Sequence, residues 1–225
     1  PSLTKINGRH AMHRSTPTLA KYILSWYFLL WIIITRDKNF LYTINIALTQ
    51  NIHHLLSNES FIPIAEKISI LFQPEHILIL SQAVALIHAY RREMKMAKLW
   101  CLISLMTFFT VFSLKYTFNT IRPCALISPY TCAKESLHAF PSGHIAMIWV
   151  FFRTIQLDSI LNKKWITGMK WTLIWLLIAS RVVLKAHWMI DIFGAILISQ
   201  TIWMIFDEFH DIWSGHSERT KNIII

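Results

Sequence analysis

The sequence predicts an all-α protein, a polytopic helical bundle with about six transmembrane helices. Of its 225 residues, 54% are hydrophobic and only 15% are charged, and the mean hydropathy is +0.43, which is too apolar for an ordinary soluble domain. Apolar runs recur along the chain with short basic segments between them. With only five glycines and seven prolines there is little room for linkers. We therefore expect one membrane domain over 1–225, with a polar segment 1–19, a helical core 20–206 and a polar tail 207–225.

The positive charge of the chain favours a membrane environment over nucleic acid. The net charge is +10 at neutral pH, but the Lys and Arg residues lie mostly between apolar runs. Cations at such positions anchor a helix to anionic lipid headgroups. We expect the lipid bilayer as the surroundings and no nucleic-acid partner.

The cysteines leave one question open. Cys101 lies inside an apolar run and is predicted to be a small core residue. Cys124 and Cys132 share one loop and could form a disulfide if that loop faces an oxidising compartment. The sequence does not decide this, because it contains no geometry.

The first apolar run, residues 22–35, predicts a retained membrane helix. A signal peptide is the alternative, but no small-residue cleavage site follows the run. Residues 40–56 mix Ile and Leu with polar side chains and predict a helix that lies in the membrane interface. The adjacent His53 and His54 are not expected to bind a metal, because no carboxylate or Cys accompanies them at ligand spacing.

The next span, 74–90, begins with Pro74, a residue that suits a first helical turn, and an apolar segment 61–72 leads into it. The remaining spans are predicted over about 99–114, 145–161, 171–184 and 188–206. Six spans place both termini on one side, together with the basic connectors 91–98 and 163–164. The positive-inside rule assigns that side to the cytoplasm. Loop 115–142 and the corner 184–188 then face the opposite side.

Loop 115–142 opens with two cations at Lys115 and Arg122, followed by Pro123. Seven residues make nearly two helical turns, so both cations can project from one side as the helix leaves the membrane, and Pro123 is predicted to end that helix. Taken alone, the pair has an ordinary explanation, because a Lys often snorkels at a membrane boundary and an Arg is a common loop charge.

A second motif, Pro141-Ser142-Gly143-His144, directly precedes the fourth predicted span. Ser142 suits an N-cap, and Gly143 permits close approach of the backbone. The free N–H groups of a helix start bind anions. Alone, the stretch could be only a capped helix start.

The third motif places Arg181, His187 and Asp191 at the junction of two apolar segments, where an unpaired charge is unfavourable. His187 and Asp191 are four residues apart, and this spacing allows the carboxylate to fix which imidazole nitrogen stays basic. Arg181 has a planar cation suited to phosphate oxygens. A lone His–Asp pair is commonly structural, but the predicted topology brings all three motifs to one face.

The three motifs resemble the signature of the type 2 phosphatidic acid phosphatases, a superfamily that includes glucose-6-phosphatase and the vanadium haloperoxidases. The family pattern K-x6-R-P, P-S-G-H and S-R-x5-H-x3-D is complete in Lys115–Pro123, Pro141–His144 and Ser180–Asp191. The resemblance implies a membrane phosphatase with its active site at the extracytoplasmic interface. Halogenation is a poor alternative, because the haloperoxidases are soluble.

The resemblance also implies the roles of the site residues. His187 would be the nucleophile, oriented by Asp191, and His144 the general acid. The phosphate would be held by Lys115, Arg122 and Arg181 together with Ser142 and Gly143. No metal and no cofactor are expected.

The expected function is hydrolysis of a lipid phosphate or pyrophosphate at the outer face of a bacterial inner membrane. Candidate substrates are undecaprenyl pyrophosphate, phosphatidylglycerol phosphate, phosphatidate and lipid A phosphates, and loop 124–140, with Glu135 and His138, is expected to contribute to the choice. A lipid phosphotransferase that uses the same site is the alternative within the family. A non-catalytic binder or transporter of anionic lipids is the alternative from another class, and binding alone would not require two histidines and Asp191.

Overall fold

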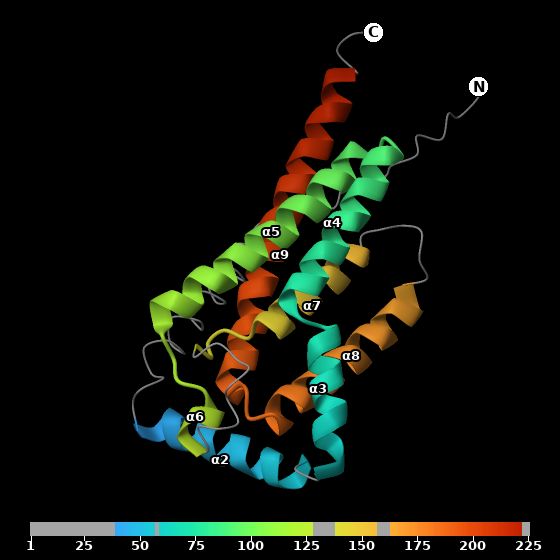
Figure 1. Ribbon diagram of the computed structural model, residues 1–225. Helices are drawn as coiled ribbons and strands as arrows, with labels where there is room; N and C mark the ends of the chain where they lie inside the picture. Colours follow the sequence, from blue (N-terminus) through green and yellow to red (C-terminus); the bar gives the residue numbers. More distant parts are fainter. Residues whose placement is uncertain (1–38, 57–58, 128–137, 157–162, 222–225) are drawn as a thin grey trace, which may run out of the picture.

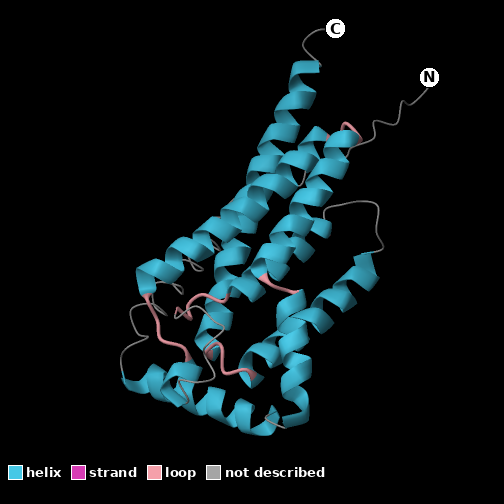
Figure 2. Ribbon diagram, in the orientation of Figure 1, coloured by secondary structure: helices cyan, strands magenta, loops and turns pink. Residues whose placement is uncertain are grey.

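Helices make up the regular structure of the described part of the chain, apart from an isolated antiparallel bridge between Ile121 and His138 (Figure 2). The structure is a computed structural model that describes residues 39–56, 59–127, 138–156 and 163–221. The elements are α2 (Asn39–Leu56), η1 (Glu59–Phe61, a 3-10 turn), α3 (Ile62–Leu71), α4 (Pro74–Tyr90), α5 (Met94–Phe118), α6 (Pro123–Ile127), α7 (Gly143–Ile155), α8 (Lys163–Val183) and α9 (Met189–Lys221). The all-α prediction is confirmed.

Within the described residues, four segments are long and apolar enough to cross a membrane. They are Ile62–Tyr90, Met94–Phe118, Lys164–Val183 and Met189–Phe206. These correspond to the second, third, fifth and sixth predicted spans. The fourth predicted span corresponds to the shorter apolar helix α7. The first, residues 22–35, lies outside the described residues, as does the polar segment 1–19.

Two predicted boundaries were wrong. The connector 163–164 forms the start of α8. The apolar part of α9 ends at Phe206, as predicted, and the helix continues into the polar tail to Lys221, where Glu, Arg and Lys are good helix formers. Pro123 does not end the third membrane helix. That helix, α5, ends at Phe118 because Asn119 adopts a left-handed conformation (φ 43°), and Pro123 begins α6 instead.

Helix α7 lies at the centre of the bundle. It packs against α4, α5, α8 and α9, and all eight residues of 143–150 are buried. Its 13 residues extend for about 20 Å, which is shorter than the hydrocarbon core of a bilayer at about 30 Å. The start of α7, with Gly143 and His144, is therefore enclosed by the other helices.

The two ends of the bundle are formed by different connections. Figure 1 shows α2, α6 and the corner between α8 and α9 at one end, and the α4–α5 turn and the C-terminus of α9 at the other. The first end is held together by the backbone, because the N–H of Cys124 donates to the carbonyl of Lys185 at 2.9 Å. Loop 115–142 and corner 184–188 thus meet, as the topology predicted.

Gly194 of α9 is expected not to tolerate a side chain. A Cβ at this position would press on Cε2 of Phe140 and lie 2.7 Å from Cζ of the same ring. The ring is 1% exposed and packs edge-to-face on Phe118, so it has no free space to enter. Gly194→Ala should lower the free energy of unfolding by about 1–3 kcal/mol and reduce activity, because Phe140 adjoins the Pro141 motif.

The measurement is thermal unfolding of the purified protein in detergent. Gly168→Ala is the matched control, because nothing lies within 4 Å of a Cβ at that helical glycine and alanine favours the helix by about 1 kcal/mol. A Gly194→Ala protein as stable and active as the Gly168→Ala protein would contradict the prediction.

Candidate active site

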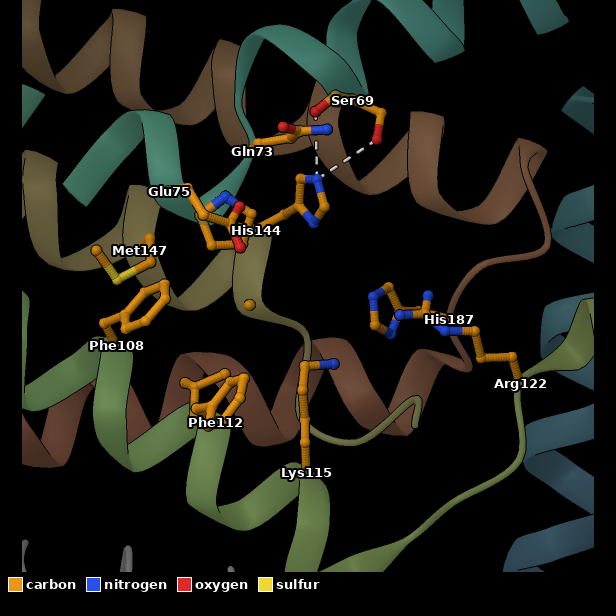
Figure 3. A pocket seen from close by; sticks show the side chains of 13 residues that line it. Ser69, Gln73, Glu75, Phe108, Phe112, Lys115, Arg122, His144, Met147 and His187 are labelled. Atoms are coloured by element: carbon orange, nitrogen blue, oxygen red, sulfur yellow. Dashed lines mark hydrogen bonds between the residues drawn. The ribbon is translucent and has the colours of Figure 1, made fainter. Parts of the chain in front are cut away.

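A cavity of about 370 Å³ lies where the break between α3 and α4 meets α5, α7 and the α8–α9 corner (Figure 3). Five of the eight predicted site residues line it: Lys115, Arg122, Gly143, His144 and His187. The other three are buried directly behind the lining: Ser142, Arg181 and Asp191. The three motifs therefore meet at one site, as their spacing predicted.

The two cations of the first motif come from different local structures. Lys115 is in the last turn of α5, and its Nζ donates to the carbonyl of His138 at 3.0 Å. Arg122 lies beyond the end of α5 and is only 3% exposed. It donates from Nη1 to the carbonyl of Ala186 at 2.8 Å. The pair thus does not share one helix, and Arg122 reaches the cavity because it is hydrogen-bonded to the corner 184–188.

The second motif forms the start of α7, and Ser142 is its N-cap residue. The prediction of an N-cap is right about the position, but the Ser142 hydroxyl makes no capping hydrogen bond. Its oxygen is fully buried and has no hydrogen-bond partner in the described structure. Burying an unpaired hydroxyl costs about 1–3 kcal/mol, so this group is suited to a ligand. A Cβ on Gly143 would lie 3.0 Å from Cγ of Pro74, which explains the glycine.

The His187–Asp191 pair differs from the predicted arrangement on one helical face. Helix α9 begins at Met189, so His187 lies in the corner before it and Asp191 reaches back from the first turn. The distance from His187 Nδ1 to Asp191 Oδ2 is 3.4 Å, and the backbone N–H of Trp188 donates to the same oxygen at 2.8 Å. A carboxylate can accept hydrogen bonds but cannot donate them. Nδ1 of His187 therefore bears the hydrogen, and Nε2 stays basic.

Helix α2 holds this corner through two hydrogen bonds to the start of α9. The backbone N–H of Ile190 donates to Asn45 Oδ1 at 3.2 Å, and that of Met189 donates to Thr49 Oγ1 at 3.4 Å. Both amides belong to the first turn of α9, where no helical partner exists. The sequence predicted α2 as an interfacial helix and did not indicate that its polar residues cap α9.

Ser69 of α3 is a second contact that the sequence did not indicate. Its carbonyl oxygen lies 3.2 Å from His144 Nε2, and its hydroxyl lies 3.4 Å from the same nitrogen. The hydroxyl also accepts a hydrogen bond from Nη1 of Arg181, a fully buried side chain. The available signal was a serine inside an apolar run, five residues before Pro74.

The environment of His187 favours the neutral ring. Burial lowers the pKa of His187 well below its ordinary value of 6.5, and the positive charges of Arg122, Arg181 and Lys115 lower it further. The ring lies in the corner between two membrane segments and is 1% exposed. It therefore stays neutral, and able to act as a nucleophile, at pH values where an exposed histidine is protonated.

We expect the titration midpoint of His187, followed by NMR of the phosphate-free protein, to lie below pH 6.5. Arg122→Gln, which keeps a side-chain donor and removes the charge, should raise the midpoint. Because the folded-state pKa lies below that of the unfolded chain, the protein should also lose stability as pH falls below 6.5. A His187 midpoint at or above pH 6.5 would contradict this account.

The sequence model of the PAP2 superfamily matches residues 95–212, more than half of the chain, and the match includes all three motifs. The chain belongs to the PAP2 superfamily. The prediction that the protein is a membrane phosphatase is confirmed at the level of the family. Its apolar helices identify it as an integral membrane protein.

Two solved structures resemble this PAP2 protein. One is a transmembrane phosphatidylglycerolphosphate phosphatase of the PAP2 type from Bacillus subtilis, with a TM-score of 0.67 and 18% identity over 85% of this chain and 96% of that one. The other is LpxE from Aquifex aeolicus, with a TM-score of 0.35 and 21% identity over 79% and 92% of the two chains. The Bacillus subtilis structure shows that the two proteins share a fold. The TM-score of the LpxE structure is too low to show the same. No curated protein matches the chain.

Two further predictions about this PAP2 protein concern cysteines and metals. Cys101 is a free thiol and Cys124 is disulfide-bonded, while Cys132, the partner that the sequence left open, lies outside the described residues, as does Glu135. Among the residues that the structure describes, no three His, Cys, Asp or Glu side chains form a cluster that could hold a metal ion. The expected independence of metals stays a prediction.

Proposed function

We propose that this PAP2 protein hydrolyses the phosphate headgroup of a membrane lipid through a phosphohistidine at His187. The observation that carries the proposal is that His144 and His187 line one cavity together with two cations, Lys115 and Arg122. A nucleophile, a proton donor and positive charge around one space are what phosphoryl transfer requires.

In the first step, the bare Nε2 of His187 attacks phosphorus as the bond from phosphorus to the leaving oxygen breaks. The leaving oxygen takes a proton from His144, which limits the charge that develops on it. The cations of Lys115, Arg122 and Arg181, with the buried hydroxyl of Ser142, stabilise the negative charge on the other phosphoryl oxygens. Asp191 stabilises the positive charge that His187 acquires.

In the second step, water attacks the phosphohistidine. His144, now neutral, takes a proton from the water as the bond from phosphorus to His187 breaks. Inorganic phosphate leaves, and both histidines return to their starting states. If a lipid hydroxyl replaced water, the same residues would carry out phosphotransfer, and the products of the reaction distinguish the two.

A lipid substrate fits the lining of the cavity, which is cationic on one side and, apart from Glu75, mostly apolar on the other. The apolar side includes Phe108, Phe112 and Met147. Phe108 and Phe112 belong to α5, one of the segments that can cross a membrane, and Phe112 is 49% exposed on the outside of the bundle. A phosphate bound at Lys115 can thus leave its hydrocarbon chains beside α5, in the bilayer.

The proposed location is a bacterial inner membrane with the site facing the periplasm. The basic segment 91–98 lies at the end of the bundle away from α6 and the corner 184–188 (Figure 1). The positive-inside rule places that segment in the cytoplasm, so the end with the corner faces outward. Phosphatidylglycerol phosphate, phosphatidate, undecaprenyl pyrophosphate and lipid A phosphates are the candidate substrates. The first corresponds to the activity of the Bacillus subtilis protein.

The test is phosphate release by the purified protein from each of these lipids in mixed micelles, with a chelator present. Release from at least one lipid that vanadate inhibits supports the proposal, because vanadate imitates pentacoordinate phosphorus. Stoichiometric phosphorylation of an acceptor lipid without free phosphate would assign phosphotransfer instead. Lipid binding without turnover of any phosphate would assign the non-catalytic alternative.

A further inference from the structure

We infer that Ser69 is a positioning residue of this active site, which holds Nε2 of His144 and so assigns proton transfer to Nδ1 of that ring. The inference rests on the proposed function, since it concerns how the proposed general acid works. Ser69 belongs to α3, outside the three motifs and outside the residues 95–212 that match the family. It is 7% exposed and lines the cavity.

The carbonyl of Ser69 is available because Pro74 interrupts the helix. Pro74 has no N–H to donate to Ile70, so the N–H of Gln73 donates to the Ile70 carbonyl instead, at 3.4 Å. In an uninterrupted helix, that N–H would have bonded to the Ser69 carbonyl. The Ser69 carbonyl is left for a partner outside the helix, and His144 Nε2 lies 3.2 Å from it.

This contact determines which nitrogen of His144 bears the resting hydrogen. A backbone carbonyl can only accept, so Nε2 must be the donor and must hold a hydrogen. In the neutral ring, Nδ1 is then bare. Figure 3 shows Nε2 joined to both oxygens of Ser69, while the other nitrogen of the ring is turned away from Ser69, toward the part of the cavity that Lys115 and His187 line. Nδ1 is therefore the atom placed to give and take the proton.

The hydroxyl of Ser69 links the general acid to a phosphate-binding cation. Its oxygen accepts from Nη1 of Arg181 and lies 3.4 Å from His144 Nε2. Arg181 is fully buried, and His144 is 8% exposed. A single side chain thus fixes the distance between the group that protonates the leaving oxygen and a group that holds the phosphate. Such supporting contacts typically contribute about 10–100-fold to activity in other sites.

The assignment keeps the reaction balanced. With a phosphate bound, His144 holds hydrogens on both nitrogens. As the phosphorus–oxygen bond breaks and His187 Nε2 bonds to phosphorus, the Nδ1 hydrogen passes to the leaving oxygen. In the second step, Nδ1 takes a proton from the attacking water. The other hydrogen stays bonded to Nε2 throughout and is donated to the oxygens of Ser69.

The experiment compares Ser69→Ala with wild type on two leaving groups. One substrate is the lipid monophosphate that wild type hydrolyses fastest, which releases an alkoxide that needs a proton. The other is p-nitrophenyl phosphate, whose leaving group is stable without one. The variant keeps the Ser69 carbonyl and removes the hydroxyl, so His144 Nε2 loses one of its two partners and its link to Arg181. We expect kcat to fall about 10-fold with the lipid and to change less than about twofold with the aryl phosphate. If the substitution moves Arg181, KM should rise for both substrates.

Two variants control for packing. Ser69→Thr keeps the hydroxyl and should retain most of the lipid activity. Ser81→Ala removes a hydroxyl that is also buried, in α4, and donates to the carbonyl of Ile77 in its own helix, so it should leave both rates unchanged. Equal kcat losses on the two substrates in Ser69→Ala would overturn the inference, as would unchanged rates on both. Absence of phosphate release by wild type would instead reject the proposed function.

A second measurement does not depend on turnover. NMR of the phosphate-free protein with ¹⁵N-labelled histidine reports which nitrogen of a neutral ring bears hydrogen, and His144→Gln identifies the His144 signals. The inference predicts a protonated Nε2 and a bare Nδ1. The opposite tautomer at His144 would overturn it, even if the protein is an active phosphatase.

Discussion

Replacing His187 with alanine should lower phosphate release by about 10³-fold or more, because the substitution removes the only atom proposed to bond to phosphorus. The ring of His187 is 1% exposed and lines the cavity, so little solvent is available to substitute for it. Activity is measured as kcat in mixed micelles with the best lipid substrate. Acid quenching with ³²P-labelled substrate should trap a phosphoenzyme in wild type and none in the variant.

His76→Ala is the matched control for this prediction. His76 is exposed on α4, two residues from Pro74, and does not line the cavity. Its removal should leave kcat and the phosphoenzyme unchanged. A His187→Ala protein that folds normally and still releases phosphate at the wild-type rate would show that the nucleophile has been misassigned, whichever lipid is used.

The residues that we propose act on phosphate could be predicted from the sequence because their spacing is local. Ser142-Gly143-His144 adjoin one another, and Arg181, His187 and Asp191 lie within eleven residues. The hydropathy pattern then predicted that these segments lie on one face of the membrane, although the sequence indicates no contact between them. The structure confirms that they meet, and it changes the local geometry: α9 begins after His187, and α5 ends before Arg122.

The contacts that hold those residues could not be predicted, because they join distant parts of the chain. Ser69 and His144 are 75 residues apart, and Asn45 and Ile190 are 145 apart. Neither Ser69 nor Asn45 differs in sequence from an ordinary polar residue in an apolar helix. Hydropathy also extended the fourth span to residue 161, because it measures apolar content and does not register where a helix such as α7 ends.

Asp191 should show a large difference between two substitutions. Its Oδ2 serves two donors, the backbone N–H of Trp188 at 2.8 Å and His187 Nδ1 at 3.4 Å. In Asp191→Asn, the N–H of Trp188 needs an acceptor, so the new amide turns its oxygen, and not its NH2 group, toward Trp188. That oxygen still accepts from His187 Nδ1, and Nε2 remains bare. Only the negative charge is lost, and kcat should fall about 10-fold.

Asp191→Ala removes both the charge and the acceptor. Trp188 then loses the carboxylate that satisfies an amide at the start of α9, and His187 can adopt either tautomer or turn away. We expect kcat to fall about 10²–10³-fold and thermal stability to fall with it, while Asp191→Asn stays close to wild type in stability. Equal losses of activity in the two variants would show that Asp191 acts through its charge alone, and that its hydrogen bonds do not set the tautomer of His187.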